Sequence, residues 1–287
     1  TTLAAGPALL TPEDGANDVP PNVEFSWQAL PGAISYQLQV ATDQAFGNII
    51  LDEDGLTATN FLPASALQTD TRYYWRVIAE NVCNATNENE VFTFRTQPGP
   101  GDCPAGTTPR IIYLSDFEQG AAGWQDTSSD LFHWSLSTVQ AHSPMTAWLS
   151  SVPAQISDQR LVSPSFSLPE EETTLSFSFW HRWTFDSASV CNDGGVLEIS
   201  TNNGVTWSPV PANVLLTTPY TGVIRSGVFN PLARRQAWCG VTDWSWTVVD
   251  LAAYAGQNVI FRFRMGSGDA GGAEGWYVDD VRVQSCI

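Results

Sequence analysis

Alternation of apolar and polar side chains is the feature that most constrains the fold of this chain. Two segments illustrate it, because every second residue in each is apolar or aromatic: Leu175, Phe177, Phe179, His181 and Trp183 in the first, and Val259, Phe261, Phe263 and Met265 in the second. Successive side chains of a β-strand point to opposite faces, so a period of two predicts half-buried strands. Beyond residue 109 the chain holds about ten such segments and no convincing helical pattern, which predicts an all-β protein.

The charge of the chain narrows the range of its partners. Its 287 residues include 30 Asp and Glu against 12 basic residues, all of them arginine, for a formal net charge of −18. Nucleic-acid binders and proteins that dock on anionic membranes both need clustered cations, so we exclude both classes. A run of about 18 apolar residues, the length needed to span a bilayer, is also absent. The hydrophobic content of 43% is nevertheless high enough for a sizeable core.

The five cysteines lie far apart in the sequence, and none forms a Cys-x-x-Cys pair. This spacing excludes zinc-ribbon and thioredoxin-type sites, and in a lysine-free β-rich chain it favours extracellular disulfides over buried free thiols. We expect Cys191 to pair with Cys239 and Cys83 with Cys103, which leaves Cys286 free or bonded outside the chain. The sequence begins at Thr1 without a signal peptide, so we expect a secreted segment of a longer precursor.

A Pro- and Gly-rich stretch, QPGPGDCPAGTTP at 97–109, interrupts the alternation. We therefore predict a first domain at 1–97, a linker at 98–109 and a second domain at 110–287. The first domain resembles a fibronectin type III module over residues 6–97, with Trp27 in an early strand and Leu67 six residues before Tyr73. That spacing is typical of a tyrosine corner. The resemblance implies a β-sandwich that serves as a spacer or a protein-contact surface.

The second domain has longer and more aromatic strands, including a hairpin predicted around Asn203-Gly204. This pattern predicts an antiparallel β jelly roll larger than the first domain. The domain resembles the jelly roll near the C-terminus of many secreted bacterial metallopeptidases, including the immune-inhibitor-A type, in DFEQGAAGW (116–124), CNDGGVLEISTNNGVTW (191–207) and GWYVDDVRVQSC (275–286). The resemblance covers nearly all of residues 110–286. It implies a non-catalytic accessory domain whose catalytic partner lies upstream in the same precursor.

The sequence lacks the motifs of a hydrolytic active site. None of the three histidines belongs to an H-E-x-x-H motif, and G-x-S-x-G is absent. His181 alternates with aromatic residues, which favours a hydrogen-bonded core histidine. Asp279 and Asp280 are adjacent on a predicted strand, so their side chains should point to opposite faces and cannot flank one glycosidic bond. We predict no catalytic residues.

Carboxylates near the two ends of the second domain indicate a cation site. A period of two places Asp279 among apolar neighbours such as Val281 and Val283, where a lone ionised carboxylate would be costly. Asp116 and Glu118 follow the first strand of the domain, and first and last strands often meet in a jelly roll. Three acids without lysine suit Ca²⁺, which prefers oxygen ligands.

The metallopeptidase resemblance likewise implies a structural Ca²⁺ held by Asp116, Glu118 and Asp279, with Asp158 and Asp193 as weaker candidates. The alternative is that Asp116 and Glu118 pair with arginines such as Arg110 or Arg262 and that no metal binds.

Ten of the twelve tryptophans lie in the second domain. Exposed aromatic rings stack on sugars, so we consider Trp180, Trp238 and Trp244 candidate binding residues, together with Arg234 and Arg235. The alternatives are that these tryptophans cover the core and that the arginines occupy a solvated turn.

Three functions are compatible with these features. The first is an accessory region of a secreted metallopeptidase that binds a protein or matrix substrate. The second is a carbohydrate-binding pair of modules attached to another secreted hydrolase. The third is an adhesive or structural surface protein, for which self-association through the unpaired cysteine is expected.

Overall fold

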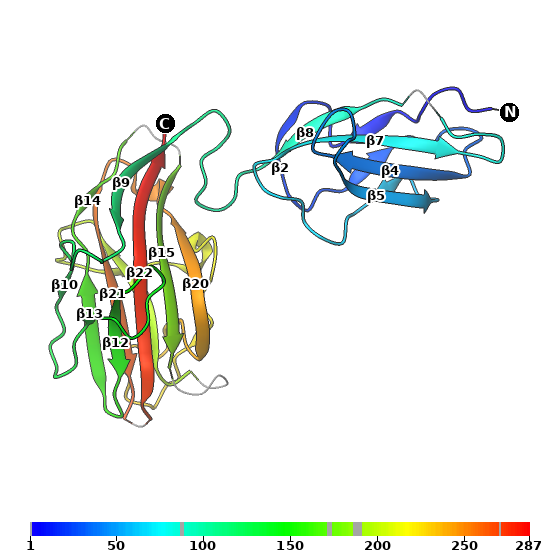
Figure 1. Cartoon of the computed structure of the whole chain (residues 1–287). Helices are drawn as coiled ribbons and strands as arrows, with labels where there is room; N and C mark the ends of the chain where they lie inside the picture. Colours follow the sequence, from blue (N-terminus) through cyan, green and yellow to red (C-terminus); the bar gives the residue numbers. More distant parts are fainter. Residues whose placement is uncertain (1, 87–88, 171–173, 186–190, 270) are drawn as a thin grey trace. The chain divides into compact units, whose positions relative to one another are not determined.

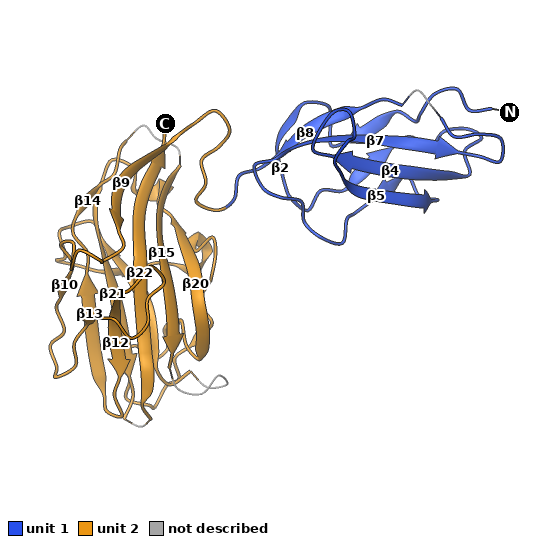
Figure 2. Cartoon of the chain, in the orientation of Figure 1, with its two compact units in different colours: residues 1–99 blue, residues 100–287 orange. Residues whose placement is uncertain are grey.

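The structure is a computed structural model that describes residues 2–86, 89–170, 174–185, 191–269 and 271–287. The chain divides into two units, unit 1 at residues 1–99 and unit 2 at residues 100–287 (Figures 1 and 2). Both units consist of β-strands, and the helical elements of the described part are two short 3-10 turns, Ala212–Val214 and Ala252–Tyr254. The predicted all-β fold class is therefore confirmed. No helix in these ranges has the length and apolar character needed to cross a membrane.

Unit 1 is a sandwich of a three-stranded and a five-stranded sheet. The smaller sheet has the order β1-β3-β6, formed by Leu9–Thr11, Phe25–Trp27 and Asn60–Phe61. The larger has the order β2-β8-β7-β4-β5, formed by Ala16–Val19, Phe92–Thr96, Arg72–Glu80, Ser35–Ala41 and Ile49–Leu56. Alternate residues of both sheets, among them Phe25, Leu38 and Trp75, are fully buried between them. The hydroxyl oxygen of Tyr73 accepts a hydrogen bond from the backbone N–H of Gln68 at 3.0 Å.

Unit 2 consists of two larger sheets whose described strand pairs are all antiparallel. The β22 sheet has the order β11-β12-β22-β15-β20, with β9 also paired to β22; these strands are Ser135–Ser137, Ala147–Val152, Ala273–Cys286, Leu175–Thr184, Val241–Asp250 and Pro109–Ser115. The β21 sheet has the order β10-β13-β21-β16-β17, with β14 paired to β21; these strands are Gln125–Asp126, Ser157–Val162, Asn258–Ser267, Gly194–Ser200, Ser208–Pro209 and Phe166–Ser167. A short hairpin of β18 (Gly222–Val223) and β19 (Gln236–Ala237) completes the described strands.

The core of unit 2 lies between these two sheets and follows the predicted alternation. Phe177, Phe261 and Phe263 are fully buried, and the rings of Phe177 and Phe261 stack at 4.0 Å. His181 is a hydrogen-bonded core residue, as predicted: its ring nitrogens bond to the hydroxyl of Thr247 and the indole N–H of Trp276. Burial lowers the pKa of His181 to about 3, so the ring is neutral at physiological pH.

The longest strand, β22, does not keep one pleat along its length. Ser178 and Trp180 are two residues apart on β15, but their partners on β22, Arg282 and Asp279, are three residues apart. The extra residue lies in a bulge where Asp280 has a positive φ of 47°. This β-bulge reverses the alternation. Trp276 and Val278 therefore face the same core as Val281 and Val283, whereas Asp279 faces outward. The prediction that Asp279 shares a face with Val281 and Val283 is wrong, because a uniform pleat was assumed across the bulge.

The disulfides join Cys191 to Cys239, as predicted, and Cys103 to Cys286. The predicted Cys83–Cys103 bond is wrong, since Cys83 is a free, exposed thiol. The reason is the path of the predicted linker, residues 98–109, which is part of unit 2 from Pro100 onward. Its backbone at Thr108 exchanges two hydrogen bonds with Ile287, so Cys103 lies beside the last strand of unit 2.

Candidate functional site

An acidic hollow lies where β22 changes its partner. The first half of β22 pairs with β12 and the second half with β9, so the bulge at Asp279–Asp280 falls between the two partners. The segment before β12, residues 142–146, and the segment after β9, residues 116–118, meet at this gap. Asp116, Ser143 and Asp280 line a hollow of about 340 Å³ there.

The Asp279 carboxylate is completely buried beneath residues 142–146. Its Oδ2 accepts the backbone N–H groups of His142 and Ser143 at 2.8 and 3.1 Å, and its Oδ1 accepts that of Asp280 at 2.8 Å. Burial raises the pKa of Asp279 to about 6, and the charge of Asp280 acts in the same direction, although the three N–H donors oppose it. Asp279 therefore ties the 142–146 segment to the bulge.

The neighbouring carboxylates hold the same segment. Oδ1 of Asp280 accepts the hydroxyl of Ser143 at 2.7 Å, and its Oδ2 lies 2.5 Å from Nδ1 of His142. Glu118 accepts the backbone N–H groups of Met145 and Thr146 at 3.0 and 2.7 Å. The structure thus brings the predicted Asp116, Glu118 and Asp279 to one loop.

The described residues contain no group of three or more His, Cys, Asp or Glu side chains that converge in metal-ligand geometry. Glu118 and Asp279 are occupied by N–H donors. Asp116, in contrast, accepts one hydrogen bond within the described part of the chain, from the backbone N–H of Glu118 to Oδ1 at 3.2 Å.

The weaker metal candidates lie elsewhere, in and beside the β21 sheet. Asp158 is bound by Arg160 and Arg264 at 2.5 and 2.7 Å on the outer face of that sheet. Asp193 is fully buried and accepts the backbone N–H of Gly268 at 2.6 Å. Neither residue lines the acidic hollow.

The outer face of the β21 sheet also carries a second acid held by arginines. Glu198 is bound by Arg235, at 2.5 Å, and by Arg262. Burial disfavours the charged form of Glu198, but its hydrogen bond to Arg235 and the charges of both arginines outweigh burial, so the pKa of Glu198 lies below its ordinary value. The ring of Trp207 covers the guanidinium of Arg262 at 4.3 Å.

The outer face of the β22 sheet carries an aromatic cluster next to the acidic hollow. We call His142, Trp180, Trp244 and Tyr277 the aromatic face. The imidazole of His142 stacks on Trp180 at 3.9 Å, and Trp244 lies 5.7 Å from His142 and 6.4 Å from Tyr277. Trp180 and Trp244 remain half-exposed.

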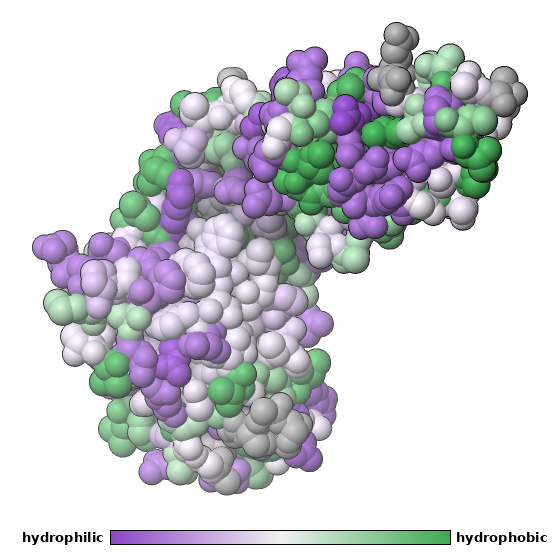
Figure 3. Space-filling view, turned by 45° about the vertical axis from the view of Figure 1, so that its right-hand side comes forward, coloured by the Kyte–Doolittle hydropathy of each residue, from purple (hydrophilic) through white to green (hydrophobic). Residues whose placement is uncertain are grey.

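Charged groups border this aromatic face. Arg182 lies over the Tyr277 ring at 5.7 Å and 3.5 Å from Glu274, and the Asp243 side chain is 91% exposed. In Figure 3, much of the visible surface of unit 2 is pale, the colour of residues of intermediate hydropathy, with purple hydrophilic groups around it. Flat rings beside hydrogen-bonding groups are what a sugar or peptide ligand requires.

The other predicted binding residues do not join the aromatic face. Trp238 is fully buried and donates its indole N–H to the carbonyl of Thr218, so its assignment as a binding residue is wrong. Its ring packs against Phe179 and Trp276 in the core and against Tyr220, and the alternation along one strand does not reveal these contacts. Arg235 is engaged by Glu198, and Arg234 occupies an exposed turn with a positive φ of 70°.

Sequence reasoning missed His142 and Arg182, which complete this surface, and Tyr277, which is buried against Arg182 and Trp244. Arg182 and Trp180 are two residues apart on one strand, so the period of two could have placed them together. His142 lies outside any strand, and its contact with Trp180 depends on how residues 142–146 cross the sheet.

No family model matches the chain. Among curated proteins it is similar to Bacillopeptidase F of Bacillus subtilis (strain 168), with 25% identity over 180 residues, which covers 59% of this chain and 10% of that protein. The chain thus spans about a tenth of the length of that relative.

Solved structures with partial likeness include the adhesin domain of Lys-gingipain from Porphyromonas gingivalis W83, with 15% identity, a TM-score of 0.38, and coverage of 61% of this chain and 97% of that one. A xylan-binding domain from Paenibacillus barcinonensis has 14% identity and a TM-score of 0.37, covering 63% and 97%. An Fn3-like protein from Clostridium thermocellum has 26% identity and a TM-score of 0.25, covering 32% and 94%. With TM-scores this low, the fold assignment rests on the strand pairing described above.

Proposed function

We propose that the chain is a non-catalytic accessory region of an extracellular peptidase or related hydrolase. The observation that carries this proposal is the similarity to Bacillopeptidase F, because the matched part is a tenth of that peptidase and has the size of one or two accessory domains. Two disulfide bonds support an extracellular setting. The histidines also have structural roles: His181 lies in the core, His133 is held by Asp126 and His142 by Asp280.

The class of the parent enzyme is the finer part of the proposal. The resemblance of unit 2 to the jelly roll of immune-inhibitor-A-type enzymes supports a metallopeptidase with its catalytic domain upstream of residue 1. The complete coding sequence tests this directly. An upstream H-E-x-x-H motif on a predicted helix supports a metallopeptidase, whereas the motif of another hydrolase class refutes it.

In this proposal the aromatic face of unit 2 binds the polymer on which the parent enzyme acts. Half-exposed Trp180 and Trp244 supply apolar contact area, and Arg182, Asp243 and Glu274 supply hydrogen bonds at the border. A protein or matrix substrate fits a peptidase. A polysaccharide is the second candidate, which the partly exposed indole of Trp244 favours because flat aromatic rings stack on sugar rings.

A sedimentation assay distinguishes these ligands. The chain is mixed with insoluble proteins and, separately, with insoluble polysaccharides, and the bound fraction is measured as a function of concentration. We expect Trp244→Ala and Trp180→Ala to weaken binding at least tenfold, as for a central aromatic anchor. Trp207→Ala is the matched control, because Trp207 lies on the other sheet against Arg262. Equal losses in all three variants, or binding to neither class of polymer, would refute the proposal.

We also propose that a Ca²⁺ ion binds in the acidic hollow and stabilises unit 2. Asp116 and Asp280 are the first candidates for carboxylate ligands, since both line the hollow. Asp280 also contacts Ser143 and His142 through its two oxygens, so Asp116 is the less engaged of the two. The lining offers carboxylate and hydroxyl oxygens, the donor types that Ca²⁺ prefers.

Thermal unfolding with and without a chelator tests the calcium proposal. Calcium at about 100 times its Kd would contribute about 2.7 kcal/mol, which corresponds to a rise of about 5–10 °C in the Tm of a unit of this size. Asp116→Asn should abolish this difference. Restoring calcium after the chelator treatment is the control. A wild-type Tm that does not respond to the chelator would refute the calcium proposal.

A further inference from the structure

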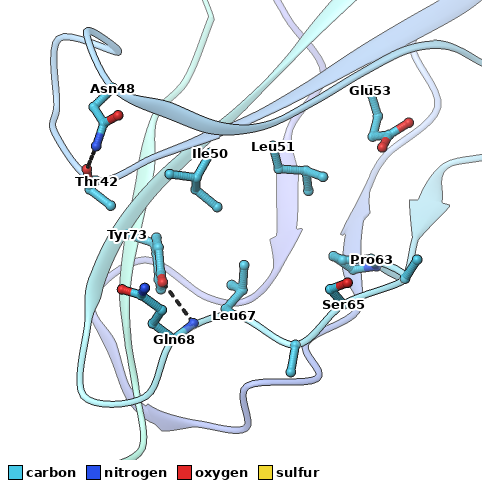
Figure 4. Close-up of a pocket in the computed structure, with 12 residues that line it drawn as sticks. Thr42, Asn48, Ile50, Leu51, Glu53, Pro63, Ser65, Leu67, Gln68 and Tyr73 are labelled. Atoms are coloured by element: carbon cyan, nitrogen blue, oxygen red, sulfur yellow. Dashed lines mark hydrogen bonds between the residues drawn. The ribbon is translucent and has the colours of Figure 1, made fainter.

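A hollow in unit 1 is separate from the aromatic face and the acidic hollow, both of which belong to unit 2. Its volume is about 570 Å³, and it runs between strand β5 and the chain that leads from β6 into β7 (Figure 4). Ile50, Leu51 and Glu53 of β5 form one wall. The other wall is residues 63–68, from Pro63 to Gln68. We call this hollow the β5 groove.

The groove exists because the two sheets of unit 1 differ in width. The five-stranded sheet ends in β5, while the opposite sheet has three strands and ends in β6. Leu51 and Glu53 pair with Val40 and Leu38 of β4, both fully buried, and lie in the same inward-facing rows. These rows continue past the point where the smaller sheet ends, so Leu51 and Glu53 are only half-buried.

The β5 wall offers a strand edge for pairing. Among the strands described, β5 pairs only with β4, so its other edge is open. The unpaired N–H and C=O groups of an edge strand form a template for another extended chain. An apolar hollow beside that edge can take the alternate side chains of such a chain, the arrangement used in recognition by β-strand addition.

The charge of the groove selects the kind of chain that can enter. Glu53 is the ionisable acid in its lining, and within the described residues its carboxylate makes no hydrogen bond or ion pair. Asp52 and Asp54 flank it on β5. A carboxylate that points inward at a strand edge discourages pairing with another acidic chain. A second copy of this protein is such a chain, because it carries a net charge of −18 and no lysine.

We propose that the β5 groove binds an extended peptide of another protein that carries a lysine or arginine. The peptide adds as a strand to the open edge of β5, and its basic side chain meets Glu53. Leu51 and Glu53 are two residues apart on one face of the strand. Since alternate residues of the added strand face the groove, the peptide needs an apolar residue two positions from its basic residue. This site lies entirely within unit 1, so its test is independent of the test of the function proposed for unit 2.

The test uses an immobilised library of nine-residue peptides and the full chain. Apolar residues vary at alternate positions, and the central residue is arginine, lysine, glutamine or glutamate. We expect peptides with a basic centre to be selected. For a selected peptide, Glu53→Gln should raise the Kd about fivefold, as for a partly exposed ion pair. Asp54→Asn is the matched control, since Asp54 is on the same strand but outside the groove, and it should leave the Kd unchanged.

Two further changes test the strand addition itself. The backbone nitrogens of the peptide form two alternating sets, and only one set points its N–H groups toward β5. N-methylation of that set should abolish binding, because it removes the hydrogen bonds between the peptide and β5. Ala66→Trp should also abolish binding by filling the groove, and thermal unfolding will verify that this variant folds. The proposal is overturned if no peptide is retained, if acidic centres are selected as often as basic ones, or if Ala66→Trp binds like the unaltered chain.

Discussion

Removal of the Cys103–Cys286 disulfide should be the most damaging single covalent change in unit 2. The bond closes a loop of 183 residues. In the chain-entropy treatment, the crosslink raises the free energy of the unfolded state by about 5 kcal/mol at 25 °C for a loop of this length. Because measured values often fall below that figure, we expect the free energy of unfolding to decrease by about 3–5 kcal/mol in the double variant Cys103→Ser/Cys286→Ser.

Urea unfolding followed by tryptophan fluorescence measures this change, since ten of the twelve tryptophans belong to unit 2. The Cys191–Cys239 bond closes only 48 residues, so its removal should cost about 1 kcal/mol less than removal of Cys103–Cys286. Cys83→Ser is the control, because that thiol is free and exposed, and it should leave both units unchanged. A loss below about 1 kcal/mol in the Cys103→Ser/Cys286→Ser variant would refute the reasoning.

Two further stability predictions follow from single contacts. Glu198→Gln should destabilise unit 2 by about 2–3 kcal/mol at pH 7, because Arg262 loses a buried partner. Because the pKa of Glu198 is lowered in the folded state, its contribution is fully present above the unfolded-state pKa of about 4.3 and is lost as pH falls through the folded-state pKa. The gap between the urea midpoints of the two proteins should therefore narrow as pH falls below about 4.3, and a constant gap would contradict this. Tyr73→Phe should cost unit 1 about 1 kcal/mol, since the N–H of Gln68 loses its acceptor; an unchanged urea midpoint for unit 1 would contradict the role of that bond.

The strands were predictable because their signal is local. Phe261 and Phe263 face the core while Arg262 and Arg264 face outward, as the alternation along one strand requires. His181 was predictable for the same reason, because its neighbours at alternate positions are large aromatic residues.

The parts that were mispredicted depend on which strands meet. The bulge at Asp280 lies where β22 exchanges β12 for β9, and no pattern within β22 marks that exchange. The pairing of Cys103 with Cys286 depends on the path of residues 100–109 along the last strand. Trp238 and Trp244 occupy similar aromatic stretches, yet Trp238 packs inside the core whereas Trp244 lies on the outer face of the β22 sheet. The candidate site could therefore be predicted as a set of residue types, but not as an arrangement.

The most direct test of the accessory role is to fuse the chain to a peptidase domain and compare hydrolysis of an insoluble polymer with hydrolysis of a small soluble peptide. The account predicts that the chain increases the rate on the insoluble substrate, leaves the rate on the soluble peptide unchanged, and loses this effect in the Trp244→Ala variant. No increase on any insoluble substrate, or an equal increase on both kinds of substrate, would contradict it.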